Sequence, residues 1–270
     1  MGKTKRLGMS LLLGSGMMVA GPVIAGCVPS SGVSHADWAA TEGAMGRINM
    51  DAVQEAFKNA KSIEEFEKRL NEIYEGDKIV LVRAKEEDGK RTIEAFEDLN
   101  GDGEMNPDQD DLLFTITNEN DSNTIQGRGA NSYRSGFGGP GSFLFTYLIF
   151  SSLTRGGYGY ATPRGRVGQM RTERTNYRNS SAYASGRSGG QVKRNSDYYS
   201  RQRATNRGTY NSAGRQLSPA RSSYISTAKT SGSFKSSNTG VRAGFGKVGG
   251  RGGSASGGGG AQVIIGRGRW

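Results

Sequence analysis

The chain has 270 residues and a formal net charge of +11, and Leu, Ile, Val and Phe make up only 17% of it. A share below roughly 20% predicts that part of the chain cannot bury a core. Because the sequence holds one cysteine and one histidine, its composition argues against zinc centres and against nucleophiles activated by a histidine. Catalysis would then have to depend on carboxylates, and no substrate-binding motif accompanies them in the sequence. We therefore expect a protein that is not an enzyme.

Residues 1–26 have the pattern of a signal peptide. Basic residues stand at the start, and an apolar run covers 7–20. The segment ends in Ile24-Ala25-Gly26-Cys27, which resembles the lipobox of bacterial lipoproteins. The resemblance implies cleavage before Cys27, a covalent diacylglycerol on its thiol, and an N-acyl chain such as palmitate on the new amino group.

The lipid predicts where the mature protein resides. Two or more acyl chains hold a protein stably on a membrane, whereas a single chain does not. The lipobox resemblance therefore implies a lipid-anchored protein of the bacterial cell envelope. In bacterial lipoproteins, an Asp directly after the lipidated cysteine directs retention in the inner membrane. This chain has Val28 at that position, so the resemblance favours the outer membrane. Residues 27–45 are rich in Ser, Ala and Gly and are expected to form a tether.

Residues 46–127 are predicted to form a small acidic α+β domain, with two helices packed on a short antiparallel sheet. Apolar residues recur at helical spacing from Asp51 to Ala60, and Ser62 to Glu65 has the form of a capping box before a second apolar stripe. Three segments have the pattern of strands, the first two joined by a hairpin turn. They are 79–82, 92–96 and 112–116.

The stretch from Asp98 to Asp111 is strongly acidic and resembles the calcium loops of EF-hand and dockerin repeats. Calcium takes several oxygen ligands, and alternating short carboxylates and amides around a glycine turn supply them. The predicted ligands are Asp98, Asn100, Asp102, Glu104, Asn106 and Asp110. Gln109 stands where the pattern has a bidentate carboxylate. The alternative is an acidic hairpin loop in which Asn-Gly and Asp-Gly pairs serve backbone geometry.

Residues 128–154 contain an apolar block flanked by glycines. The block is too short to span a bilayer as a helix, which needs about 20 residues. It is either part of a core, an interfacial segment on the lipid, or a partner-binding element, and its isolation by glycines favours membrane or partner contact. The contact residues would be Phe143, Leu144, Phe145, Tyr147, Leu148, Ile149 and Phe150.

Residues 155–270 form a basic Gly/Ser/Arg/Tyr-rich segment of low complexity, predicted to be largely disordered. Residues 28–127 carry a net charge of −13 and residues 128–270 a net charge of +21. Such asymmetry is typical of an interaction tail, although the two halves could instead fold onto each other. Arginines among aromatic residues are also typical of RNA-binding segments, but export argues against cytosolic RNA.

These observations favour a membrane-anchored envelope lipoprotein without enzymatic activity. Its basic tail would bind anionic lipid or envelope polymers such as lipopolysaccharide, a wall polymer or extracellular DNA. The alternative is a calcium-stabilised assembly or scaffold subunit that binds a membrane-protein partner through the apolar block. The overall layout is similar to that of uncharacterised envelope lipoprotein families with Ser/Gly/Arg-rich tails.

Overall fold

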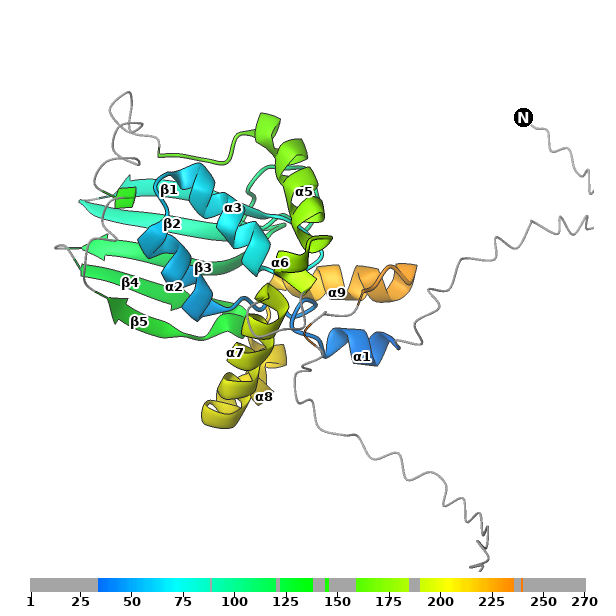
Figure 1. Cartoon of the computed structure of the whole chain (residues 1–270). Helices are drawn as coiled ribbons and strands as arrows, with labels where there is room; N and C mark the ends of the chain where they lie inside the picture. Colours follow the sequence, from blue (N-terminus) through cyan, green and yellow to red (C-terminus); the bar gives the residue numbers. More distant parts are fainter. Residues whose placement is uncertain are drawn as a thin grey trace, which may run out of the picture. The chain divides into compact units, whose positions relative to one another are not determined.

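A five-stranded antiparallel sheet in the order β1-β2-β3-β4-β5 forms the centre of the computed structural model (Figure 1). The structure describes residues 34–87, 89–119, 122–137, 144–145, 159–184, 190–235 and 239, which belong to one compact unit. The strands are β1 Val80–Glu87, β2 Lys90–Glu97, β3 Asp111–Glu119, β4 Ser122–Gly127 and β5 Arg134–Phe137. The helices before the sheet are α1 His35–Ala39, α2 Met50–Asn59 and α3 Ile63–Ile73. Later helical segments are η1 Gly129–Asn131, α5 Arg164–Arg178, α6 Ser181–Ala184, α7 Gln191–Thr205, α8 Arg207–Ser212, η4 Ala213–Gln216 and α9 Pro219–Ser231.

The predicted α+β class and the three predicted strands are confirmed. β1 and β2 form a hairpin that pairs Val80 with Glu97 at one end and Glu87 with Lys90 at the other, and Gly89 adopts φ +74° in the turn. Residues on one face of the strands, such as Ile93 and Ile116, contribute to the main buried core. β4 and β5 extend the sheet beyond the segments recognised in the sequence.

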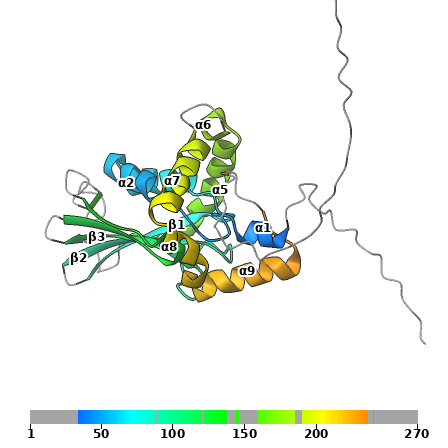
Figure 2. The same cartoon turned by 90° about the horizontal axis from the view of Figure 1, so that it is seen from below.

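α2 and α3 lie side by side in front of the sheet in Figure 1, and Figure 2 shows α2 beside one face of the sheet. Ser62 caps α3 as predicted, because its hydroxyl accepts from Glu65 N at 3.1 Å. α2 begins at Met50, one residue before the predicted start, and its cap is Asn49, whose amide oxygen accepts from Ala52 N at 3.1 Å. Both helices bury their apolar stripe in the core.

The open edge of β1 is covered by the chain that returns to the sheet before α5. Ala84 N donates to Tyr160 O at 2.7 Å and Thr162 N donates to Val82 O at 2.9 Å. Buried Glu67 of α3 holds this returning segment, since it accepts from the Tyr160 hydroxyl at 2.8 Å. Covering an edge strand removes a template for aggregation.

Burial raises the pKa of Glu67 above its ordinary value of 4.5. Because the folded carboxyl keeps its proton to a higher pH than the unfolded one, its contribution to stability is full below about pH 4.5 and is lost as the pH rises through the folded pKa. We expect the free energy of unfolding of the wild type, relative to Glu67→Gln, to fall as the pH rises above about 4.5, by at most about 1.4 kcal/mol per pH unit. Urea unfolding at several pH values measures this difference. Identical pH profiles of the two proteins would contradict it.

The prediction of only two helices is not confirmed, because α5 to α9 lie within the segment expected to be disordered. The core reaches this segment through Tyr198, Tyr199 and Tyr210, and Arg174 and Arg221 are also buried. Aliphatic residues are scarce here, but tyrosine rings and arginine stems bury apolar surface as well. The disorder prediction is therefore wrong for residues 164–184 and 190–231, while residues 241–270 lie outside the described residues.

The acidic and basic halves of the chain fold onto each other, which the sequence analysis left as an alternative. Within the described residues, five arginines of the later half pair with six carboxylates of the earlier half. The pairs are Arg164 with Glu104, Arg166 with Glu67, Arg171 with Asp98, Arg201 with Asp51, and Arg221 with both Glu97 and Asp111. Part of the tail's charge is therefore neutralised within the molecule.

The segment expected to be a tether also joins this unit. Trp38 of α1 is fully buried and lies 6.5 Å from Tyr224 and 5.8 Å from Phe234, between ring centroids. Every residue from 41 to 45 is buried. The tether prediction is thus wrong for 35–45, because aromatic residues near α9 cover Trp38, and residues 1–33 lie outside the described residues.

Candidate functional site

α5 carries a stripe of three arginines along one side. Arg171, Arg174 and Arg178 are spaced three and four residues apart, which places them on the same helix face. The guanidinium of Arg178 donates from Nη2 to the carbonyls of Tyr74 and Gly76 at 3.0 Å each. Arg174 donates to the same two carbonyls and to that of Lys78. Neutral carbonyls fix these arginines in place but supply no negative charge.

Two of the three arginines hold a charge that no carboxylate contacts directly within the described residues. Within the described residues, neither Arg174 nor Arg178 forms an ion pair, and the Nε of each makes no hydrogen bond. Arg174 is only 6% exposed, and burial together with the nearby charge of Arg178 lowers its pKa to about 10. Positive charge held this way is favourable only if a negative group approaches it.

The stripe borders a cleft of about 480 Å³ between α5 and the acidic loop, which we call the basic cleft. Its ionisable lining residues are Lys78, Arg171, Arg174, Arg178 and Lys235 on the positive side and Asp77 and Asp98 on the negative side. Gly101 separates two of the cations, because a Cβ built on it would lie 3.8 Å from Lys78 Nζ and 4.0 Å from Arg171 Nη2. The basic cleft therefore brings several cations around a space large enough for a ligand.

The acidic loop supplies the opposite wall of this cleft. The carboxylate of Asp98 is fully buried and accepts from Gly101 N at 2.9 Å, Gly103 N at 3.2 Å and Arg171 Nη2 at 3.2 Å. Asp110 accepts from Leu99 N at 3.0 Å and from a second backbone N–H. Both side chains therefore serve the backbone of the loop, as expected of a hairpin loop shaped by Asp and Gly.

The other predicted calcium ligands make contacts of their own. Asn100 donates to Asp102 Oδ2 at 2.8 Å, and Glu104 pairs with Arg164. Asn106 accepts through its side chain from Asp108 N at 3.0 Å. Among the residues the structure describes, no group of three or more His, Cys, Asp or Glu side chains is placed to hold a metal ion. Calcium binding by this loop stays a prediction.

The structure places two residues of the predicted apolar contact surface in the core. Leu144 and Phe145 are fully buried, and the ring of Phe145 lies 5.4 Å from that of Phe57. For these two residues the prediction of membrane or partner contact is wrong, because α2 offers an apolar surface that covers them. The lipidation residue Cys27 lies outside the described residues. So do the other predicted contact residues, which are Phe143, Tyr147, Leu148, Ile149 and Phe150.

From the sequence, the arginines of α5 were predicted only to belong to a basic tail. Their spacing of three and four residues was visible in the sequence, beside Val167 and Met170, which are buried on the same helix. The carbonyls that anchor Arg174 and Arg178 could not be predicted, because every residue has a backbone carbonyl and the sequence does not show which ones accept from a side chain. The position of the basic cleft could therefore not be predicted.

Within the described part of the chain, no helix has the length and apolar character needed to cross a membrane. No protein-family model matches the chain, and no curated protein or solved structure shows significant similarity to it.

Proposed function

We propose that the protein is a lipid-anchored protein of the bacterial envelope, without enzymatic activity, whose basic cleft binds anionic groups of envelope lipids or polymers. The observation that carries the proposal is the set of five cations around the basic cleft against two carboxylates. Asp98 already accepts from Arg171 and Asp77 accepts from the Tyr224 hydroxyl at 2.9 Å, so both carboxylates are engaged. The resemblance of residues 24–27 to a lipobox supports attachment to the membrane through Cys27.

The accessible cations of the cleft would make the first contact with an anionic partner. Arg171 is 48% exposed at its side chain, Lys235 is exposed and Lys78 is half-buried. Arg174 lies deeper and adds a positive potential rather than a flexible contact. Such an arrangement binds phosphate or carboxylate groups by charge, with a strength that salt reduces.

We expect the triple variant Lys78→Gln, Arg171→Gln, Lys235→Gln to bind anionic vesicles at least tenfold more weakly than the wild type. Each substitution removes one cation from the cleft wall, and cooperating charge contacts are lost together. The measurement is co-sedimentation of residues 28–270 with vesicles of phosphatidylglycerol and phosphatidylcholine. Leaving out Cys27 separates binding by the cleft from anchoring by lipid.

The matched control is the triple variant Lys61→Gln, Lys193→Gln, Lys229→Gln. These three residues are exposed, lie outside the cleft lining, and change the net charge by the same amount. We expect the control variant to keep most of the wild-type binding. Raising the salt concentration should weaken vesicle binding by the wild type and by the control variant alike. If the two triple variants bind equally well, the anionic partner senses only net charge and the assignment to the basic cleft fails.

A further inference from the structure

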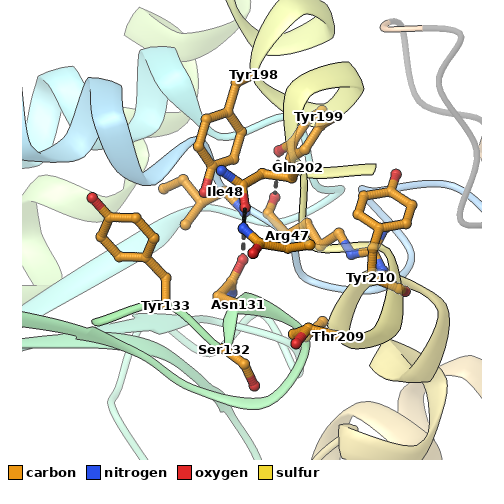
Figure 3. A pocket seen from close by; sticks show the side chains of 12 residues that line it. Arg47, Ile48, Asn131, Ser132, Tyr133, Tyr198, Tyr199, Gln202, Thr209 and Tyr210 are labelled. Carbon is orange, nitrogen blue, oxygen red and sulfur yellow. Dashed lines mark hydrogen bonds between the residues drawn. The ribbon is translucent and has the colours of Figure 1, made fainter. Parts of the chain in front are cut away.

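A second cleft lies away from the basic cleft, between η1, α7 and α8 (Figure 3). Space for water inside it amounts to about 40 Å³, which admits a small end group but not a whole sugar ring. Tyrosines from several elements border it, among them Tyr133, Tyr198 and Tyr210, and Gln202 adds an amide. We call it the tyrosine cleft.

The floor of the tyrosine cleft is fixed by hydrogen bonds. Asn131 accepts through Oδ1 from Ile48 N at 2.9 Å and donates through Nδ2 to Gly46 O at 2.9 Å. Tyr199 donates its hydroxyl to Arg47 O at 3.1 Å, and Figure 3 shows these side chains meeting around the backbone of Arg47 and Ile48. A site whose walls are held in this way requires little ordering when a ligand binds.

Arg47 brings a buried positive charge to this cleft. The residue is 3% exposed, its Cζ lies 3.7 Å from the centroid of the Tyr210 ring, and its Nη2 donates to Tyr210 O at 2.8 Å. Within the described residues Arg47 forms no ion pair, and its Nε and Nη1 make no hydrogen bond. The face of the Tyr210 ring offsets part of this charge, and a negative group nearby would offset more of it.

The acidic side chain beside Arg47 is a poor counter-charge. Glu42 is buried, and burial raises its pKa, so its neutral form is favoured over a wider pH range. Its carboxyl group is already bonded to the Tyr210 hydroxyl and to the hydroxyl of Thr239. No Asp or Glu is among the described residues that line the tyrosine cleft. The positive charge of Arg47 is therefore only partly compensated.

We propose that the tyrosine cleft binds the carboxylate end of a small molecule or of a peptide. One partly compensated guanidinium matches a single negative charge, whereas a phosphate dianion would need more cations. A carboxylate group fits the small volume, and the tyrosine rings would contact the apolar part next to it. This site is separate from the basic cleft, so either assignment can fail without the other.

Binding is tested by titrating residues 28–270 with acetate and with its neutral isostere acetamide, at constant ionic strength, while NMR follows the side-chain signals of Arg47 and Gln202. We expect saturable shifts with acetate and none with acetamide. Alanyl-alanine and its C-terminal amide form a second pair of probes. Tighter binding of the dipeptide than of acetate identifies a peptide end as the ligand, and the reverse identifies a small free carboxylate.

Gln202→Glu tests the position of the site, because it places a negative charge in the wall of the cleft. We expect this variant to bind acetate at least tenfold more weakly, while Gln54→Glu, the same change on half-buried Gln54 of α2, leaves binding unchanged. Arg171→Gln in the basic cleft should also leave it unchanged. Equal shifts with acetate and acetamide, unaltered binding by Gln202→Glu, or tighter binding of inorganic phosphate would each overturn the proposal.

Discussion

Replacing Arg221 by methionine should lower the free energy of unfolding by about 3–5 kcal/mol, the cost of removing one partner of a buried ion pair. Arg221 of α9 is fully buried and contacts two buried carboxylates, donating from Nε to Asp111 Oδ2 at 2.9 Å and from Nη2 to Glu97. Methionine fills a similar space but leaves both carboxylates without their cation. The expected loss is comparable to the whole stability of a small domain.

Denaturant unfolding of the two proteins measures this effect. The matched control is Arg201→Gln, because Arg201 pairs with Asp51 across the same two halves of the chain but both side chains are exposed. An exposed pair contributes no more than about 1 kcal/mol. Adding Glu97→Gln and Asp111→Asn to Arg221→Met should restore part of the stability. A loss below about 1 kcal/mol in Arg221→Met would show that α9 is not held by this network.

The second large effect is expected for Gly46→Ala, with a loss of more than about 3 kcal/mol in the free energy of unfolding. Gly46 adopts φ +67°, which costs a residue with a Cβ roughly 1–2 kcal/mol. The new Cβ would also lie 2.5 Å from Arg221 Nη2 and 2.7 Å from Asp111 Oδ2. Because both atoms belong to a buried ion pair, neither can move away without breaking it.

Gly232→Ala separates the two contributions. Gly232, the residue that ends α9, has the same φ of +67°, but a Cβ there would meet no atom within 4 Å. We expect this variant to lose only the conformational cost, roughly 1–2 kcal/mol. If Gly46→Ala proves no more destabilising than Gly232→Ala, the close approach of Gly46 to Arg221 is not a constraint on the fold.

Local patterns in the sequence were sufficient for the first half of the fold. The capping box at Ser62 and the β-branched residues of β1 and β2 act over a few neighbouring positions, so their signal is complete within a short window. The acidic loop was located correctly, since its glycines adopt positive φ at Gly101 and Gly103. Its carboxylates, however, bind backbone N–H groups and Arg171.

The second half was misjudged for a physical reason. Its helices are stabilised by contacts far apart in the sequence, such as Asn195 Nδ2 with Ile73 O at 2.8 Å and Arg47 with Tyr210. A count of aliphatic residues does not register this kind of burial, and the composition resembles that of a disordered segment. The candidate sites depend on the same long-range contacts, so neither could be located from the sequence.

The chain order of the Arg221 network has a consequence for biosynthesis. Glu97 and Asp111 are made long before Arg221, so a nascent chain carries both carboxylates without the cation that will neutralise them. The ion-pair network therefore cannot form until α9 has been synthesised. A network that forms only at the end of synthesis suits a polypeptide that crosses a translocation channel before it folds. The proposed lipoprotein leader would require such a crossing.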